Sequence, residues 1–146
     1  MVIKAICAAL LAALGLVLGG PVPQESEPRF GWVDLYLDPA GERLAAWQLE
    51  LDDPAGRSLV VGIEGGEHPA FAEPAYYDPA AMRGGRVILA AFSLAEELPA
   101  GRTRVARVHL EIRGPEPLES RVRLLVAGGP GGEPITAAAS AVAGGL

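Results

Sequence analysis

The chain is poor in the residues that support covalent or metal-based chemistry. Its 146 residues include one cysteine, Cys7, and two histidines, His68 and His109. A lone cysteine forms no disulfide within the chain, which excludes the class of small secreted domains held together by disulfides. A zinc site usually needs three or four Cys, His or acidic ligands. We therefore expect both histidines to be solvated, and we predict no bound metal and no other cofactor.

Basic charge is also scarce. Lys and Arg total 12 against 18 Asp and Glu, the formal net charge is −6, and Lys4 is the only lysine. An acidic chain repels phosphate backbones, and no basic patch is interleaved with aromatic residues. The sequence thus predicts that nucleic acid is not a partner.

Recognisable catalytic motifs are absent as well. Ser93 lies in AAFSLAEE, which is not the Gly-x-Ser-x-Gly turn of serine hydrolases. Glycosidase chemistry needs two carboxylates facing each other across a cleft, whereas neighbouring acids such as Asp52 and Asp53 point apart. Four acids could supply oxygen ligands to calcium, but no EF-hand spacing joins them: Asp34, Asp38, Asp52 and Asp78. We predict no catalytic residue and no enzymatic activity.

The first twenty residues have the order of a secretory signal. Lys4 precedes an apolar run over 5–18, and two glycines follow it. That order is typical of a signal peptide, and about fourteen residues are few for crossing a hydrocarbon core. We predict a signal helix over 1–20, a linker over 21–29, and a bacterial protein that is secreted or in the periplasm or cell envelope. A membrane is a partner only if the segment is not cleaved.

From residue 31 the hydrophobic pattern has the period of two that is typical of strands. In 31–38, Val33, Leu35 and Leu37 share one face, and Trp32 and Tyr36 lie on the other. Further strands are expected over 44–51, 58–64, 86–92, 102–113 and 120–127, separated by Pro and Gly turns.

The run over 86–92 is nearly all apolar, which predicts a central strand buried on both sides. The segment 93–98 could form one helical turn. The pattern predicts an all-β antiparallel sandwich over 30–128, followed by a flexible tail over 129–146.

Several short signals follow one another in a fixed order: Trp47-Gln48-Leu49 in a strand, the turn Asp53-Pro54-Ala55, Tyr77-Asp78-Pro79, the strand over 86–92, and Gly101 before a long strand. This order resembles that of cohesin domains, over about residues 33–126. The resemblance implies a nine-stranded jelly-roll sandwich, the fold of carbohydrate-binding modules of cellulases, and non-catalytic binding.

The resemblance also implies a kind of partner. Cohesins bind dockerins, which are calcium-loaded helical modules, through one sheet face, in systems that degrade polysaccharides. This chain has a single module and no dockerin repeat. The expected partner is therefore either a dockerin-like protein or a polysaccharide. The alternative is a structural envelope or matrix protein that self-associates through its sandwich.

Four aromatic residues are the candidate ligand-binding residues: Trp32, Tyr36, Tyr76 and Tyr77. Together they could form an exposed surface for stacking on a sugar or a peptide. A second interpretation is that the loop with both tyrosines folds over the first strand and covers Trp32 and Tyr36. Trp47 is expected in the core.

Overall fold

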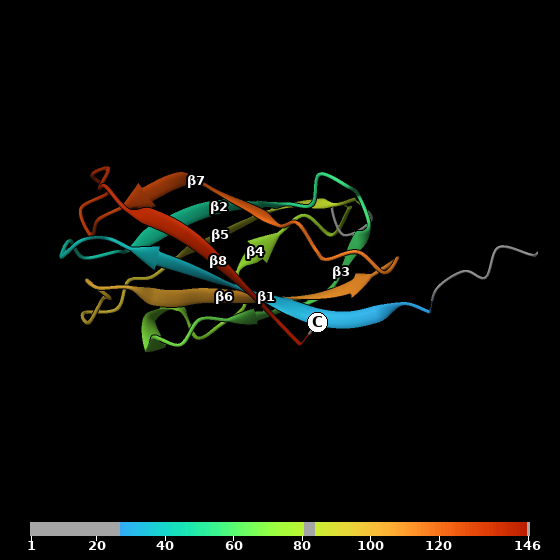
Figure 1. The fold of residues 1–146 in the computed structure, drawn as a ribbon. Coiled ribbons are helices and arrows are strands. Elements are labelled where there is room, and N and C mark those ends of the chain that lie inside the picture. Colours follow the sequence, from blue (N-terminus) through green and yellow to red (C-terminus); the bar gives the residue numbers. More distant parts are fainter. Residues whose placement is uncertain (1–26, 81–83, 146) are drawn as a thin grey trace, which may run out of the picture.

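The protein is an antiparallel sandwich of two four-stranded sheets, seen in a computed structural model that describes residues 27–80 and 84–145 (Figure 1). Sheet A has the strand order β3-β6-β1-β8 and sheet B the order β4-β5-β2-β7. The predicted signal helix over 1–20 lies outside the described residues. The strands are β1 (Arg29–Asp38), β2 (Ala46–Asp52), β3 (Ser58–Gly65), β4 (Tyr76–Tyr77), β5 (Arg86–Phe92), β6 (Thr103–Ile112), β7 (Arg121–Gly128) and β8 (Ala138–Gly144).

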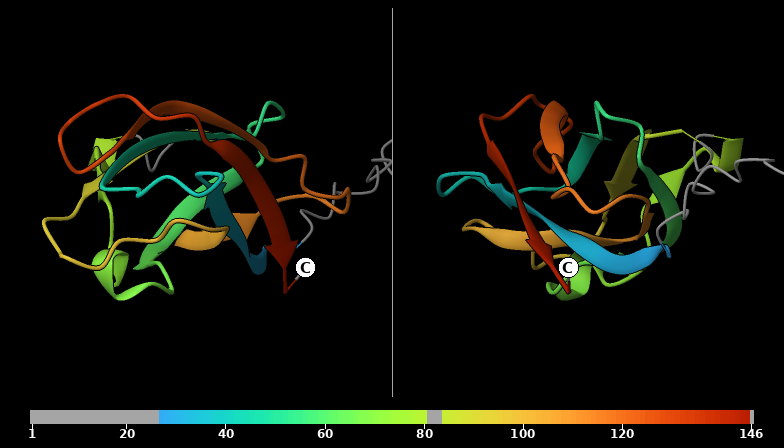
Figure 2. Two further views of the ribbon diagram at one scale, coloured as in Figure 1. Left: turned by 90° about the vertical axis from the view of Figure 1, so that its left-hand side faces the viewer. Right: turned by 45° about the vertical axis from the view of Figure 1, so that its right-hand side comes forward.

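The chain crosses repeatedly between the sheets. β1, β3, β6 and β8 belong to sheet A, while β2, β4, β5 and β7 belong to sheet B. Only β4 and β5 follow each other within one sheet, so most connections lie at the two ends of the sandwich (Figure 2). The predicted fold class is confirmed as an all-β antiparallel sandwich.

The core lies between the sheets and is built from the predicted alternation. Val33, Leu35 and Leu37 of β1 are fully buried, and Trp47 of β2 is 2% exposed. Trp47 meets Phe71 edge to face, with ring centroids 6.2 Å apart. Phe71 comes from a short 3₁₀ turn between β3 and β4, so the connection contributes to the core beside the strands.

The turn between β2 and β3 is organised by one buried carboxylate. Asp53 accepts hydrogen bonds from the backbone N–H groups of Ala55, Arg57 and Ser58, at 3.2, 2.7 and 2.8 Å. Burial by itself would raise the pKa of Asp53, but the hydrogen bonds from Ser58, Arg57 and Ala55 outweigh it and lower that pKa. The carboxylate thereby fixes the crossing from sheet B to sheet A.

Two segments differ from the sequence-based expectation. The predicted flexible tail contains β8, which pairs along β1 from Trp32↔Gly144 to Asp38↔Ala138. Its alanines lack the bulk that marks a packed strand, so the hydrophobic pattern underestimated it. The segment 93–98 forms no helical turn; the Ser93 hydroxyl instead accepts a bond from the Ala95 N–H.

The apolar run of β5 is central in its sheet but is not buried on both sides. Val87 and Leu89 point into the core and are at most 1% exposed, whereas Phe92 is 64% exposed. On the outward side of β5, Arg86 is also exposed and Ile88 and Ala90 are half-buried, so the prediction of a doubly buried strand was wrong. No helix in the described part of the chain is long and apolar enough to cross a membrane.

Candidate functional site: the outer faces of the two sheets

One end of the outer face of sheet B is apolar. Its neighbouring strands place Phe92 of β5 beside Ala46 of β2, and Ala90 beside Tyr76 of β4. On the other side of β2, Val126 of β7 lies opposite Gln48. We call the following side chains the apolar face: Ala46, Tyr76, Ile88, Ala90, Phe92 and Val126.

Three members of the apolar face are well exposed. Tyr76 is 72% exposed, Phe92 64% and Val126 49%. A hollow of about 230 Å³ adjoins Tyr76 and Phe92 at the β4 edge of the sheet, and its lining also includes Phe71, Glu73 and Pro74. Exposed apolar side chains that cluster and border a hollow are typical of surfaces that bind another molecule.

An ion-paired carboxylate marks one end of the apolar face. Glu50 of β2 lies between Arg86 of β5 and Arg123 of β7, with Arg123 Nη2 3.0 Å from Glu50 Oε1. The hydrogen bond from Arg86 is the main cause of a lowered pKa for Glu50, and the pair with Arg123 adds to it. Both arginine side chains are at least 60% exposed. This end of the face is therefore charged and exposed to solvent.

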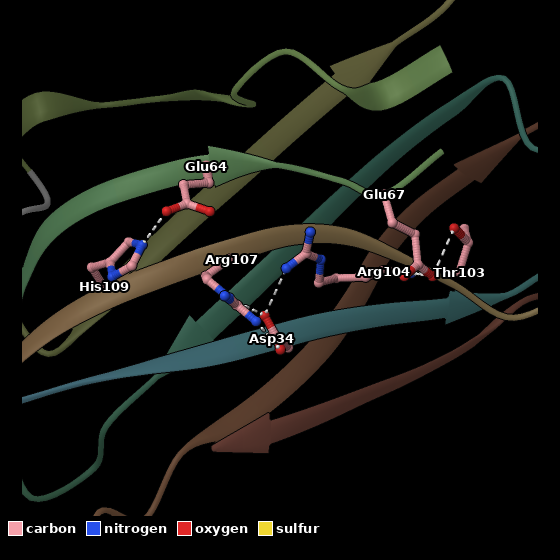
Figure 3. Close-up of polar contacts among 7 residues, drawn as sticks. All are labelled: Asp34, Glu64, Glu67, Thr103, Arg104, Arg107 and His109. Carbon is pink, nitrogen blue, oxygen red and sulfur yellow. Dashed lines mark hydrogen bonds and ion pairs between the residues drawn. The ribbon is translucent and has the colours of Figure 1, made fainter. Parts of the chain in front are cut away.

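The outer face of sheet A is polar and internally paired. Arg107 donates two hydrogen bonds to Asp34, from Nε at 2.7 Å and Nη2 at 2.8 Å, and Arg104 approaches at 3.4 Å (Figure 3). The hydrogen bond from Arg107 holds the pKa of Asp34 below its ordinary value, although burial opposes the shift. Figure 3 also shows His109 pointing toward Glu64, 2.7 Å apart.

The aromatic rings of this face are covered by other parts of the same chain. The Arg102 guanidinium carbon lies 3.7 Å from the centroid of the Tyr36 ring, and that of Arg107 lies 5.0 Å from the Trp32 ring. A Cβ added at Gly144 would come within 2.8 Å of Trp32, so β8 lies close against the indole. Sugar stacking needs an open ring face, which these contacts reduce.

Sheet A also has an open apolar hollow on its outer face. A hollow of about 270 Å³ lies between β1, β3 and β6, and its walls include Phe30, Trp32, Val61 and His109. Phe30 is 62% exposed and Val61 48%.

The four candidate ligand-binding residues do not form one surface. Trp32 and Tyr36 lie on the outer face of sheet A, while Tyr76 and Tyr77 form β4 at the edge of sheet B. The second interpretation, that the tyrosine loop covers the first strand, is therefore also wrong. The cover over Trp32 and Tyr36 comes from two arginines and β8.

The sequence reasoning missed the outer residues of β5. Ile88, Ala90 and Phe92 share the strand parity of Arg86, which is exposed. That parity was the available signal, because alternate residues of a strand face the same side.

The other candidate residues are engaged locally. His68 Nδ1 accepts a hydrogen bond from the Ala70 N–H and caps the 3₁₀ turn. Asp38 and Asp78 each accept a backbone N–H two residues on, at Ala40 and Ala80. Within residues 27–80 and 84–145, no group of three or more His, Cys, Asp or Glu side chains is placed to hold a metal.

No protein-family profile, curated protein sequence or solved structure matches this chain. The class that the structure defines is the two-sheet antiparallel β-sandwich.

Proposed function

We propose that the chain is an exported, non-catalytic binding module that takes a protein partner on the apolar face of sheet B, in the manner of a cohesin domain. The observation that carries the proposal is the apolar face itself, with Tyr76 and Phe92 exposed on the neighbouring strands β4 and β5 and Val126 exposed on β7, on the other side of β2. Burying such side chains against a partner removes apolar area from water, which is the main favourable term in protein association.

A protein partner fits this geometry better than a polysaccharide. Sugar-binding platforms use flat aromatic rings with a free face, and the rings of Trp32 and Tyr36 carry arginines of the same chain. The exposed aromatics of sheet B, Tyr76 and Phe92, are instead mixed with aliphatic side chains and border a hollow. A hollow beside apolar side chains suits an inserted side chain from a partner.

The jelly-roll arrangement is part of the proposal. Successive strands alternate between the two sheets except at β4 and β5, a feature that jelly rolls share and that supports the proposal. The neighbours within the sheets differ from those of a jelly roll, because β1 pairs with β6 and β2 with β5, whereas a jelly roll pairs its third strand with its eighth and its fourth with its seventh. Export is proposed from the leader pattern over 1–20, with its single basic residue Lys4 before an apolar run. The expected location is the bacterial cell envelope or exterior.

The test compares two phenylalanines of matched exposure. Phe92 is 64% exposed on sheet B and Phe30 62% exposed on sheet A. Immobilised wild-type protein, Phe92→Glu and Phe30→Glu are each incubated with a calcium-loaded dockerin module and, separately, with culture medium from the source organism. We expect wild type and Phe30→Glu to retain the same protein and Phe92→Glu to lose it.

A polysaccharide arm makes the proposal refutable. The same three proteins and a fourth, Trp32→Ala, are spun down with insoluble cellulose. The proposal is rejected if the wild type and Phe92→Glu pellet equally with cellulose while Trp32→Ala does not. That result would place binding on sheet A. Equal protein capture by all three chains would reject it as well.

A further inference from the structure

Four strands lie at the edges of the two sheets: β3 and β8 in sheet A, β4 and β7 in sheet B. An edge strand carries a row of backbone N–H and C=O groups without partners, and it can template the addition of another strand. Natural proteins block such edges with charged side chains, proline, bulges or very short strands.

Three of the four edges carry such a block. β3 has a bulge between Val60 and Gly62. β7 carries Arg121 and Arg123, and its pairing with β2 shifts register. β4 has only two residues and is soon followed by Pro79. These three edges are poor templates for another strand.

β8 has none of these features. Its seven residues, AASAVAG, include no charge and no proline, and its pairing with β1 runs without a register shift. Ser140 and Val142 are exposed, Val142 by 49%. No described residue pairs with the side of β8 that faces away from β1. The edge is therefore long, neutral and regular.

The composition of β8 favours a second copy of the chain over a foreign strand. Acceptor edges that select a foreign strand use pockets for alternate side chains, and alanine, serine and glycine build no such pockets. Two copies of β8 related by a two-fold axis pair antiparallel, as in an isologous interface. With Ala141 on the axis, Ser140 of one copy lies opposite Val142 of the other, and no like charges meet.

We propose that β8 pairs with β8 of a second copy, so that two A sheets join into one continuous eight-stranded sheet. This interaction goes beyond the proposed partner binding, because it uses the edge of sheet A and leaves the apolar face of sheet B free. A dimer of this kind presents two apolar faces, and a divalent partner gains avidity from both without any new contact.

The first test uses two valines of equal exposure on two different edges. Val142 of β8 and Val126 of β7 are both 49% exposed. Sedimentation velocity of the full chain is recorded from low micromolar to millimolar concentration for the wild type, Val142→Lys and Val126→Lys. We expect a wild-type dimer whose dissociation constant rises by about tenfold or more in Val142→Lys and stays unchanged in Val126→Lys.

A second readout reports on the backbone itself. Hydrogen exchange of the Ala138–Gly144 amides should slow as the wild-type concentration rises, because strand addition pairs those groups. The same amides should show no concentration dependence in Val142→Lys. Far-ultraviolet circular dichroism checks that the variant is folded, and Ser140→Lys replaces it if it is not, since that side chain is also exposed.

Three results would overturn the proposal. One is a wild-type monomer at millimolar concentration. Another is a dimer that Val126→Lys breaks and Val142→Lys leaves intact. The third is a dimer without slower exchange in β8. These results are independent of the proposed function. Phe92→Glu should lose the protein partner and keep the dimer, whereas Val142→Lys should keep the protein partner and lose the dimer.

Discussion

The outer faces of the two sheets carry similar ion-paired clusters, but the clusters differ in their exposure to solvent. Each holds one carboxylate between two arginines: Asp34 with Arg104 and Arg107 on sheet A, and Glu50 with Arg86 and Arg123 on sheet B. On sheet A the arginine side chains are at most 28% exposed, while on sheet B they are at least 60% exposed.

The neighbours of the two clusters explain the difference. On sheet A, Arg107 also lies over Trp32, and Arg102 over Tyr36, so polar and aromatic groups satisfy one another. On sheet B, Phe92 and Val126 have no such cover among the described residues. The part of sheet A around Asp34 is thus stabilised by its own contacts, whereas the Phe92 end of sheet B has apolar area left to bury.

The largest expected effect comes from removing the carboxylate of sheet A. Asp34→Ala leaves Arg104 and Arg107 without their partner in a site where these arginine side chains are only 19% and 28% exposed. We expect the free energy of unfolding to fall by about 2 kcal/mol, between the values for exposed and buried pairs. Urea unfolding measures it, with Glu50→Ala as the matched variant on sheet B.

The loss in Glu50→Ala should be clearly smaller, because its arginines are already in contact with water. Equal losses in both variants would remove the distinction between the two faces.

Acid should destabilise the fold by protonating three carboxylates. The pKa values of Asp34, Glu50 and Asp53 are lowered in the folded protein, from ordinary values of 3.8, 4.5 and 3.8. Their stabilisation is fully present above those ordinary values and is lost as the pH falls through the lower, folded-state values. The free energy of unfolding should therefore be flat near neutral pH and fall below about pH 4.

Variants can show which sheet's carboxylate causes the loss of stability in acid. Urea unfolding of Asp34→Asn and Glu50→Gln, measured from about pH 7 down to about pH 3, should show a shallower fall in each. The flattening should be greater for Asp34→Asn. An unchanged slope in Asp34→Asn would contradict the lowered pKa of that carboxyl group.

The contact between β8 and Trp32 should also be measurable. A side chain at Gly144 would meet the indole ring, since even a Cβ there lies 2.8 Å from it. We expect Gly144→Val to displace the ring, shift tryptophan emission to the red, and destabilise the fold by about 1 kcal/mol. Gly62→Ala is the control, because a Cβ there meets only ordinary contacts, the nearest at 3.7 Å on His109. A red shift in the control as well would mean that Gly144 is not special.

Much of the fold could be predicted because the core residues alternate with outward-facing residues along the strands. Val33, Leu35 and Leu37 are fully buried as expected, and Trp47 lies in the core. β8 was not predictable from hydrophobicity, since its backbone pairing with β1 is what makes it a strand. Alanine and glycine carry no strand signal of their own.

The surfaces were harder to predict than the core. Strand parity places Phe92 on the same side of β5 as Arg86, but no local pattern tells whether another segment covers that side. Trp32 was correctly expected on the outer face of its strand, but its cover by Arg107 joins residues far apart in the sequence. The same holds for Tyr36 and Arg102.

The smallest expected effect concerns that last pair, and it bears directly on which face binds. Arg102→Ala uncovers the Tyr36 ring, which now has the guanidinium carbon 3.7 Å from its centroid. An exposed cation–π pair contributes about 0.5 kcal/mol, so thermal unfolding should shift only slightly. If arginine cover is what prevents sugar stacking, the variant should bind insoluble cellulose more strongly than the wild type. Unchanged cellulose binding would mean that the Arg102 side chain is not what prevents sugars from binding to sheet A. The shape or charge of the sheet would then be the cause.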